Sequence, residues 1–94
     1  MGSIHIVWDL PDDLDGNVAH LEEHGVTSDE VEDILHDPAS QTTTSRTSGQ
    51  RITFGYTSEG RYLAVVWEHV DDEPLTAYPI TAYEAPEPRR QRRR

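Results

Sequence analysis

The hydrophobic spacing of this chain changes at Pro38, from the period of a helix to the alternation of a β-strand. Before Pro38, Val18 and Leu21 share one face of a predicted helix. This helix begins at Asn17 and stops at Gly25, since glycine commonly follows the last turn of a helix. A chain that groups its helices and its strands in this way is typical of an α+β fold.

A second helix has the clearest local signal in the sequence. Thr27 is a good N-cap and Glu30 follows three residues later, so the pair predicts a capping box. Val26 before the cap and Val31 after it are placed for a hydrophobic staple. The helix is expected to end at Asp37-Pro38, because a residue before proline disfavours helical geometry. Its inward stripe contains Val31, Ile34 and Leu35.

Five other segments have the composition or the alternation of β-strands. They are residues 4–8, 42–47, 51–57, 62–70 and 75–83. The most apolar of them, 62–70, is expected to be central and covered on both faces, whereas Pro79 favours an edge position or a bulge. The sequence therefore predicts an α+β domain in the order β-α-α-β-β-β-β, with two short helices packed on one face of an antiparallel sheet. Residues 1–84 are expected to form this single domain, and residues 85–94 a flexible Pro- and Arg-rich tail.

Charge is distributed very unevenly along the 94 residues. The chain has no lysine, and five of its eight arginines fall within residues 89–94. Residues 1–88 carry three arginines against all eighteen carboxylates, a formal balance of −15. The acidic body keeps a small domain soluble, or it docks a basic partner protein or imitates nucleic acid. The basic tail is the one segment typical of nucleic-acid binding.

Composition excludes several classes of protein. Without cysteine, the chain forms neither a disulfide framework nor a thiolate metal site. No apolar run reaches the roughly 18 residues of a membrane span, and the start does not resemble a signal peptide, so a cytoplasmic protein is expected. His20 and His24 are spaced like a helical metal pair, but the intervening residues do not complete the H-E-x-x-H motif. No metal or cofactor is therefore expected.

Motifs along residues 4–84 resemble those of the BrnT-like toxins. The matching segments are Val7-Trp8-Asp9, Asn17, His24-Gly25-Val26, the helix ending at Asp37-Pro38, residues 51–56, Gly60-Arg61 and Ile80-Thr81-Ala82. The resemblance implies the RelE-type ribonuclease fold, metal-independent RNA cleavage and an antitoxin encoded beside the toxin. The chain has Glu23 where such toxins typically carry lysine, and Tyr78 and Tyr83 where they typically carry arginine.

Candidate site residues follow from this resemblance. Metal-free RNA cleavage needs groups that move protons and cations that face the phosphate. Arg51 and Arg61 are expected to clamp phosphate, and His24 and Thr81 to transfer protons or orient the substrate. The expected RNA-binding residues are Arg46, Tyr83, Arg89, Arg90 and Arg92. The alternative interpretation is that the two arginines solvate strand ends and that His24 packs at a helix corner.

Two functions are consistent with the sequence. The first is a metal-independent ribonuclease toxin of a type II toxin–antitoxin pair, with RNA as substrate and a basic or DNA-binding antitoxin as partner. The alternative is a non-catalytic acidic protein-interaction module on the same scaffold. Neither function requires a membrane, and both leave a homodimer open. The two differ in whether Arg51, Arg61 and His24 converge on one surface of the sheet.

Overall fold

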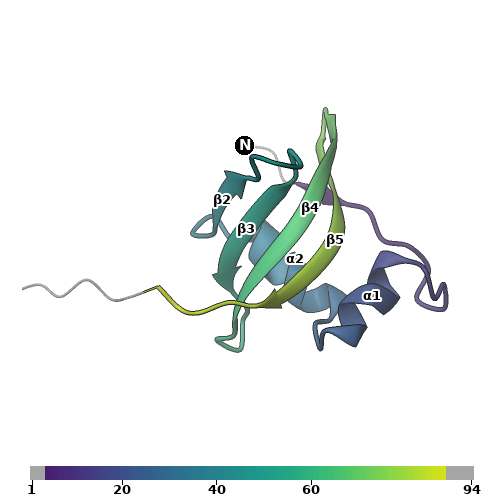
Figure 1. Cartoon of the computed structure of the whole chain (residues 1–94), viewed down its shortest axis with the longest axis horizontal. Coiled ribbons are helices and arrows are strands. Elements are labelled where there is room, and N and C mark those ends of the chain that lie inside the picture. Colours follow the sequence, from purple (N-terminus) through teal and green to yellow (C-terminus); the bar gives the residue numbers. More distant parts are fainter. Residues whose placement is uncertain (1–3, 89–94) are drawn as a thin grey trace, which may run out of the picture.

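The computed structural model describes residues 4–88, and its elements follow the predicted order. They are β1 (His5–Ile6), α1 (Asn17–Glu23), α2 (Ser28–His36), β2 (Gln41–Thr44), β3 (Arg51–Tyr56), β4 (Tyr62–Asp72) and β5 (Leu75–Glu84). One five-stranded sheet has the strand order β1-β5-β4-β3-β2, and both helices pack on the same face of it (Figure 1). The α+β class and the central position of β4 are therefore confirmed. The expectation that β4 is covered on both faces is wrong, because the two helices pack on one face of the sheet.

The sheet is mixed rather than wholly antiparallel. The pairs β2–β3, β3–β4 and β4–β5 are antiparallel, whereas β1 runs parallel to β5. The other strands are joined by short hairpins, which force antiparallel pairing. β1 is connected to the sheet through both helices, so no hairpin sets its direction.

The helix ends confirm the local sequence signals. The Thr27 side chain accepts from the Glu30 backbone, and the Glu30 side chain accepts from the Thr27 backbone, at 3.2 and 3.1 Å. Gly25 separates the two helices with φ +76°, a left-handed conformation that a side chain would strain. Asp37 is the C-cap of α2, directly before Pro38.

Two strands are shorter than predicted. Residues 4–8 contribute only a two-residue strand. Beyond it the Val7 carbonyl accepts from Asn17 Nδ2 at 3.0 Å, and the Trp8 indole packs against the core and donates to Glu32 Oε2 on α2 at 2.7 Å. The segment 42–47 pairs only as Gln41–Thr44 and then enters the turn at 46–48. Side-chain contacts and turn geometry thus end both strands where residue composition alone allows them to continue.

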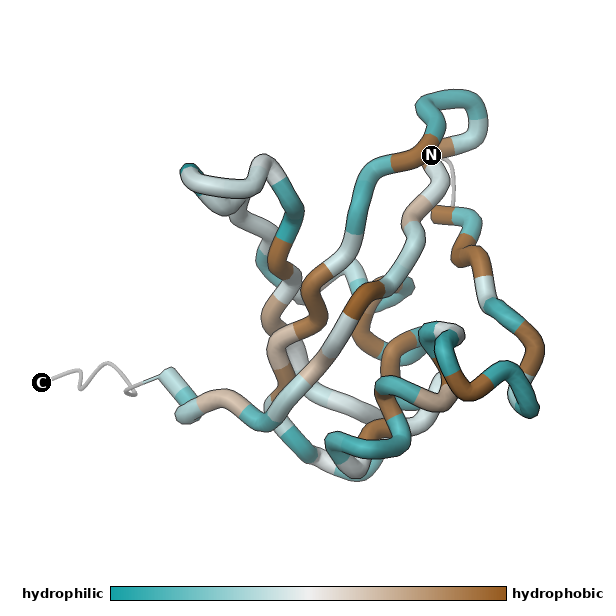
Figure 2. The backbone as a smooth tube through the Cα atoms, turned by 45° about the vertical axis from the view of Figure 1, so that its right-hand side comes forward, coloured by the Kyte–Doolittle hydropathy of each residue, from teal (hydrophilic) through white to brown (hydrophobic). Residues whose placement is uncertain are grey.

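The core lies between the helices and the middle of the sheet. It contains Leu21, Val26, Val31, Ile34, Leu63, Val65, Trp67, Ala77 and Ala82. In Figure 2 the hydrophobic stretches lie along the strands, while the hairpin ends are largely hydrophilic. The buried Trp67 indole donates to Thr53 Oγ1 at 2.8 Å, so its polar atom is satisfied inside the core.

Pro79 lies at a bulge, as its residue type predicts. The pairing of β4 with β5 shifts so that Val66 faces Thr81 while Trp67 faces Pro79, leaving Ile80 as the extra residue. The bulge reverses which side chains of β5 face the helices: Ala77 does before it and Ala82 does after it. This reversal places Thr81 on the face away from the helices.

Regular structure ends at Glu84, the last residue of β5. Residues 85–88 continue without a helix or strand, and Arg89, Arg90 and Arg92 lie outside the described residues. Among residues 4–88, no helix is long and apolar enough to cross a membrane.

Candidate functional site

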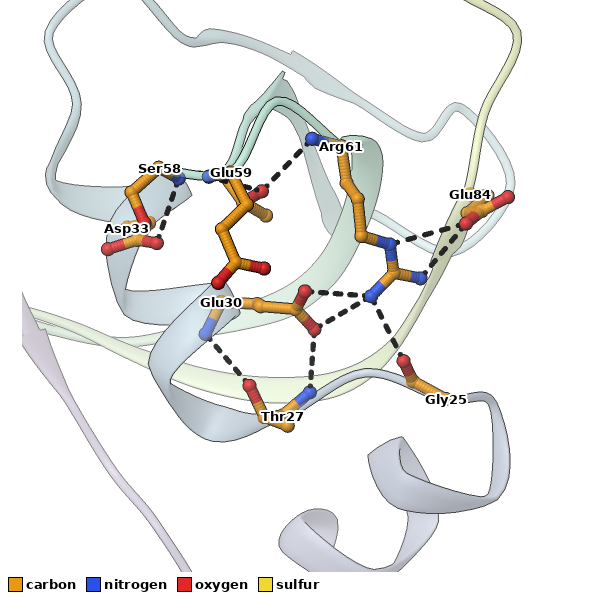
Figure 3. Close-up of polar contacts among 9 residues, drawn as sticks. Gly25, Thr27, Glu30, Asp33, Ser58, Glu59, Arg61 and Glu84 are labelled. Atoms are coloured by element: carbon orange, nitrogen blue, oxygen red, sulfur yellow. Dashed lines mark hydrogen bonds and ion pairs between the residues drawn. The ribbon is translucent and has the colours of Figure 1, made fainter.

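Arg61 is the centre of the densest polar cluster, at the corner between the two helices (Figure 3). Its Nη1 donates to both carboxylate oxygens of Glu30, at 2.9 and 2.7 Å, and to the Gly25 carbonyl at 3.1 Å. Its Nε and Nη2 donate to Glu84 Oε2 at 3.2 and 3.1 Å. The guanidinium therefore joins α2, the helix corner and the end of β5.

These contacts neutralise the arginine within the protein. The hydrogen bond that Arg61 donates to Glu30, followed by the one that it donates to Glu84, raises the pKa of Arg61 above its ordinary value. Glu30 also closes the capping box of α2, so one carboxylate serves two structural contacts. An arginine held by two carboxylates has little positive charge left with which to attract a phosphate.

His24 lies at the same corner as Arg61, because it directly precedes Gly25. It is the exposed C-cap residue of α1, and its ring lies edge-on to the ring of His20, with centroids 5.2 Å apart. His20 Nδ1 is 3.9 Å from Glu23 Oε1. Within residues 4–88, no group of three or more His, Cys, Asp or Glu side chains is arranged to hold a metal ion.

Arg51 is the first residue of β3 and lies far from the helix corner that holds Arg61. Its guanidinium stands over the Trp67 ring, 5.7 Å from the centroid, on the helix-facing side of the sheet. Tyr56, at the opposite end of β3, pairs with Tyr62 beside Arg61. Because a strand rises about 3.3 Å per residue and Arg51 pairs with Trp67, six residues from Arg61, the two backbones are about 20 Å apart along the strand direction.

The remaining candidates are placed elsewhere. Thr81 and Tyr83 lie on the sheet face away from the helices, paired with Val66 and Ala64. Arg46 is exposed in the turn between β2 and β3. Of the four expected catalytic residues, the structure brings only His24 and Arg61 to one corner, and it places Arg51 and Thr81 at two other locations.

A junction centred on Asn17 was not predicted as a site, although the sequence placed the start of a helix there. The Asn17 side chain, only 3% exposed, donates to the Val7 and Pro79 carbonyls at 3.0 and 3.1 Å. Asn17 also exchanges two hydrogen bonds with Asp9, both at 2.9 Å. Asp9 Oδ2 accepts in addition from the Tyr78 hydroxyl at 2.5 Å. No sequence signal joins these residues, since Tyr78 is 69 positions from Asp9.

Tyr78 is expected to titrate far above an ordinary tyrosine. Its hydrogen bond to Asp9, aided by burial, raises the pKa of Tyr78 from 10.0 to about 12, and the same bond lowers the pKa of Asp9 below 3.8. Because the folded-state pKa of Tyr78 is raised, its stabilising contribution is complete below pH 10 and is lost as the pH rises through 12. The measurement is a phenolate absorbance titration of the protein and of Tyr78→Phe. Their difference should have a midpoint near pH 12, and a midpoint near 10 would contradict the assignment.

Carboxylates line a hollow of about 540 Å³ between the outer side of α2 and the β3–β4 turn. Its lining residues are Thr27, Asp29, Glu30, Glu32, Asp33, Thr57, Ser58 and Glu59. The Ser58 backbone donates to Asp33 Oδ2 at 3.1 Å, which ties the turn to the helix (Figure 3). We call this surface the acidic hollow.

The sheet face away from the helices has the opposite character. Between the β3–β4 turn and Val66, alternation along the paired strands places ten side chains on it: Gln41, Thr43, Ile52, Phe54, Tyr56, Tyr62, Ala64, Val66, Thr81 and Tyr83. We call this surface the open face. None of the ten carries a charge at neutral pH, on a body with a formal balance of −15.

Comparisons with protein-family models, with curated proteins and with solved structures find no match for this chain. The fold is therefore described by its own architecture: a small α+β domain with two helices on a five-stranded mixed sheet.

Proposed function

We propose that this domain is a non-catalytic, acidic protein-interaction module on a BrnT-like scaffold, and that its partner is a basic protein. The observation that supports it is the separation of the expected catalytic residues. Catalysis requires reacting groups held within hydrogen-bond reach of one substrate. Arg51 lies at the far end of β3, Thr81 lies on the other face, and Arg61 is bound by Glu30 and Glu84.

The charge distribution supports a basic partner. Eighteen carboxylates and three arginines fall within residues 1–88, and five of these carboxylates line the acidic hollow. Such a surface attracts lysine- and arginine-rich proteins and accelerates their association at low ionic strength. A basic antitoxin of the kind that accompanies BrnT-like toxins has the required chemistry.

A metal-independent ribonuclease is the second candidate. The open face favours it: aromatic side chains of Phe54, Tyr56 and Tyr62 are close enough to stack, with centroid distances of 6.3 Å for Phe54–Tyr62 and 4.7 Å for Tyr56–Tyr62. Aromatic platforms of this kind bind single-stranded RNA. The five arginines of residues 89–94 would supply its positive charge.

Two assays on the full chain separate these candidates. The interaction module should leave RNA intact with and without added divalent cations, and it should bind a decalysine peptide with an affinity that falls at least tenfold from 50 to 500 mM salt. Asp33→Asn with Glu59→Gln should weaken this binding, whereas Arg46→Gln, which removes a positive charge, should not. RNA cleavage that is lost in Thr81→Ala or in a chain ending at Pro88 would instead establish the ribonuclease.

A further inference from the structure

The open face is built as continuous rows across four strands. Thr43, Ile52, Val66 and Thr81 form one row, and Gln41, Phe54, Ala64 and Tyr83 form the next. Tyr56 and Tyr62 extend the surface toward the β3–β4 turn. The rows consist of aliphatic, aromatic, hydroxyl and amide side chains, which can be removed from water at far lower cost than carboxylates.

This composition differs from that of an ordinary solvent-facing sheet. When other elements cover one face of an antiparallel sheet, the side chains on its other face are normally polar or charged. Here Ile52, Phe54 and Val66 are half-buried, and Tyr56 and Tyr83 are 43% and 44% exposed. Both helices pack on the opposite side of the sheet (Figure 1). At one margin of the face, Glu87 accepts from the Tyr56 hydroxyl and Pro88 lines a hollow with Phe54 and Tyr62. Contiguous exposed apolar surface of this kind marks interaction sites.

The distribution of charge around the open face indicates what covers it. Residues 38–58, which include all of β2 and β3, contain two arginines and no carboxylate. Carboxylates begin again at the margins of the face, with Glu68 on β4 and Glu87 beyond Tyr83, whereas Glu84 pairs with Leu63 on the helix-facing side and binds Arg61. The Tyr56 hydroxyl donates to Glu87 Oε1 at 3.2 Å, which places that carboxylate at the rim. Negative charge thus borders the uncharged centre on the β4 side and beside Tyr56, while the β2 edge carries none.

A second copy of this chain fits that arrangement poorly, because two negatively charged rims would face each other. Residues 1–88 of each copy also have a formal charge of −15. A partner with an apolar centre and a basic rim is complementary in both respects. We propose that the open face docks an extended or flat apolar segment of a basic partner protein, with the lysines or arginines of that segment over the acidic rim. The inference rests on the proposed interaction function and adds the surface and the chemistry of the partner.

Two peptides of equal charge test this proposal: one alternates valine with lysine, and the other alternates serine with lysine. The valine peptide should bind the full chain at least tenfold more tightly and should shift amide resonances of Ile52, Phe54 and Val66. Tyr83→Glu and Ile52→Thr should each remove this preference. Leu14→Glu adds the same charge at a side chain that is 84% exposed in the loop before α1, and should leave the preference unchanged.

Each alternative outcome has a separate meaning. Equal binding of both peptides, with shifts confined to the acidic hollow, would overturn the open-face assignment while the proposed function stands. Failure of both peptides to bind would overturn both. Concentration-dependent dimerisation detected by light scattering, with shifts on the open face, would assign the face to a second copy. Tighter binding of a single-stranded RNA oligonucleotide at the same residues would assign it to nucleic acid.

Discussion

Asn17→Asp is expected to destabilise the folded domain by about 3–4 kcal/mol. The substitution preserves shape but replaces the Nδ2 donor with an oxygen that faces the carbonyls of Val7 and Pro79, at 3.0 and 3.1 Å. Two carbonyl acceptors lose their donor, and a negative charge is introduced at a side chain that is only 3% exposed. Since small domains are stable by about 5–15 kcal/mol, the loss is a large fraction of the total.

Urea denaturation of Asn17→Asp beside the parent chain measures this effect, and thermal melting should show a decrease of roughly 15–25 °C. Asp12→Asn is the matched control, because it makes the reverse exchange at an exposed position of the preceding loop. It should change stability by less than about 0.5 kcal/mol. A change below about 1 kcal/mol in Asn17→Asp would show that the amide does not hold this junction together.

Arg61→Ala is expected to cost about 2 kcal/mol of folding stability. Most of the loss comes from Glu30, whose side chain is 16% exposed and would keep its charge without its partner. The contact with Glu84, which is 70% exposed, contributes little because solvent screens it. Arg61→Lys should recover only part of the loss, since an ammonium cannot reach Glu30, Glu84 and the Gly25 carbonyl in the same fork geometry.

Denaturant unfolding measures the stability that each contact contributes. The variants compared are Arg61→Ala, Glu30→Gln, Glu84→Gln and Arg46→Ala. Glu30→Gln should be clearly more destabilising than Glu84→Gln, and Arg46→Ala, in an exposed turn, should be close to neutral. Equal stability of Arg61→Ala and the parent chain would refute a structural role for the cluster. The result also bears on function, because any activity lost in Arg61→Ala has to be separated from the loss of fold.

Elements that depend on neighbouring residues were well predicted. The capping box at Thr27, the left-handed glycine at Gly25 and the end of α2 before Pro38 all appear as the sequence indicated. Each depends on atoms within about four positions along the chain, so the residue types alone supply the required hydrogen bonds and backbone angles. The order of the strands along the chain was predicted for the same reason, because the alternation of apolar and polar residues is a property of neighbouring positions.

The expected catalytic residues show what local sequence patterns do not reveal. Arg61 was singled out by its match to a motif of the BrnT-like toxins, but Glu30 and Glu84, which neutralise it, are 31 and 23 positions away. Thr81 would share a face with Ala77 if β5 alternated strictly, and the bulge at Ile80 turns it to the opposite side. A one-residue register shift is enough to separate two residues that a sequence pattern places together.

Local chemistry therefore decided the helix limits, the strand segments and the imbalance of charge, because each is a property of adjacent residues or of composition. Packing decided the parallel pairing of β1 with β5, the Asn17 junction, the position of Arg61 between two carboxylates and the uncharged open face. These depend on which distant segments meet, and that is settled by the free energy of the whole fold rather than by any one segment of the chain.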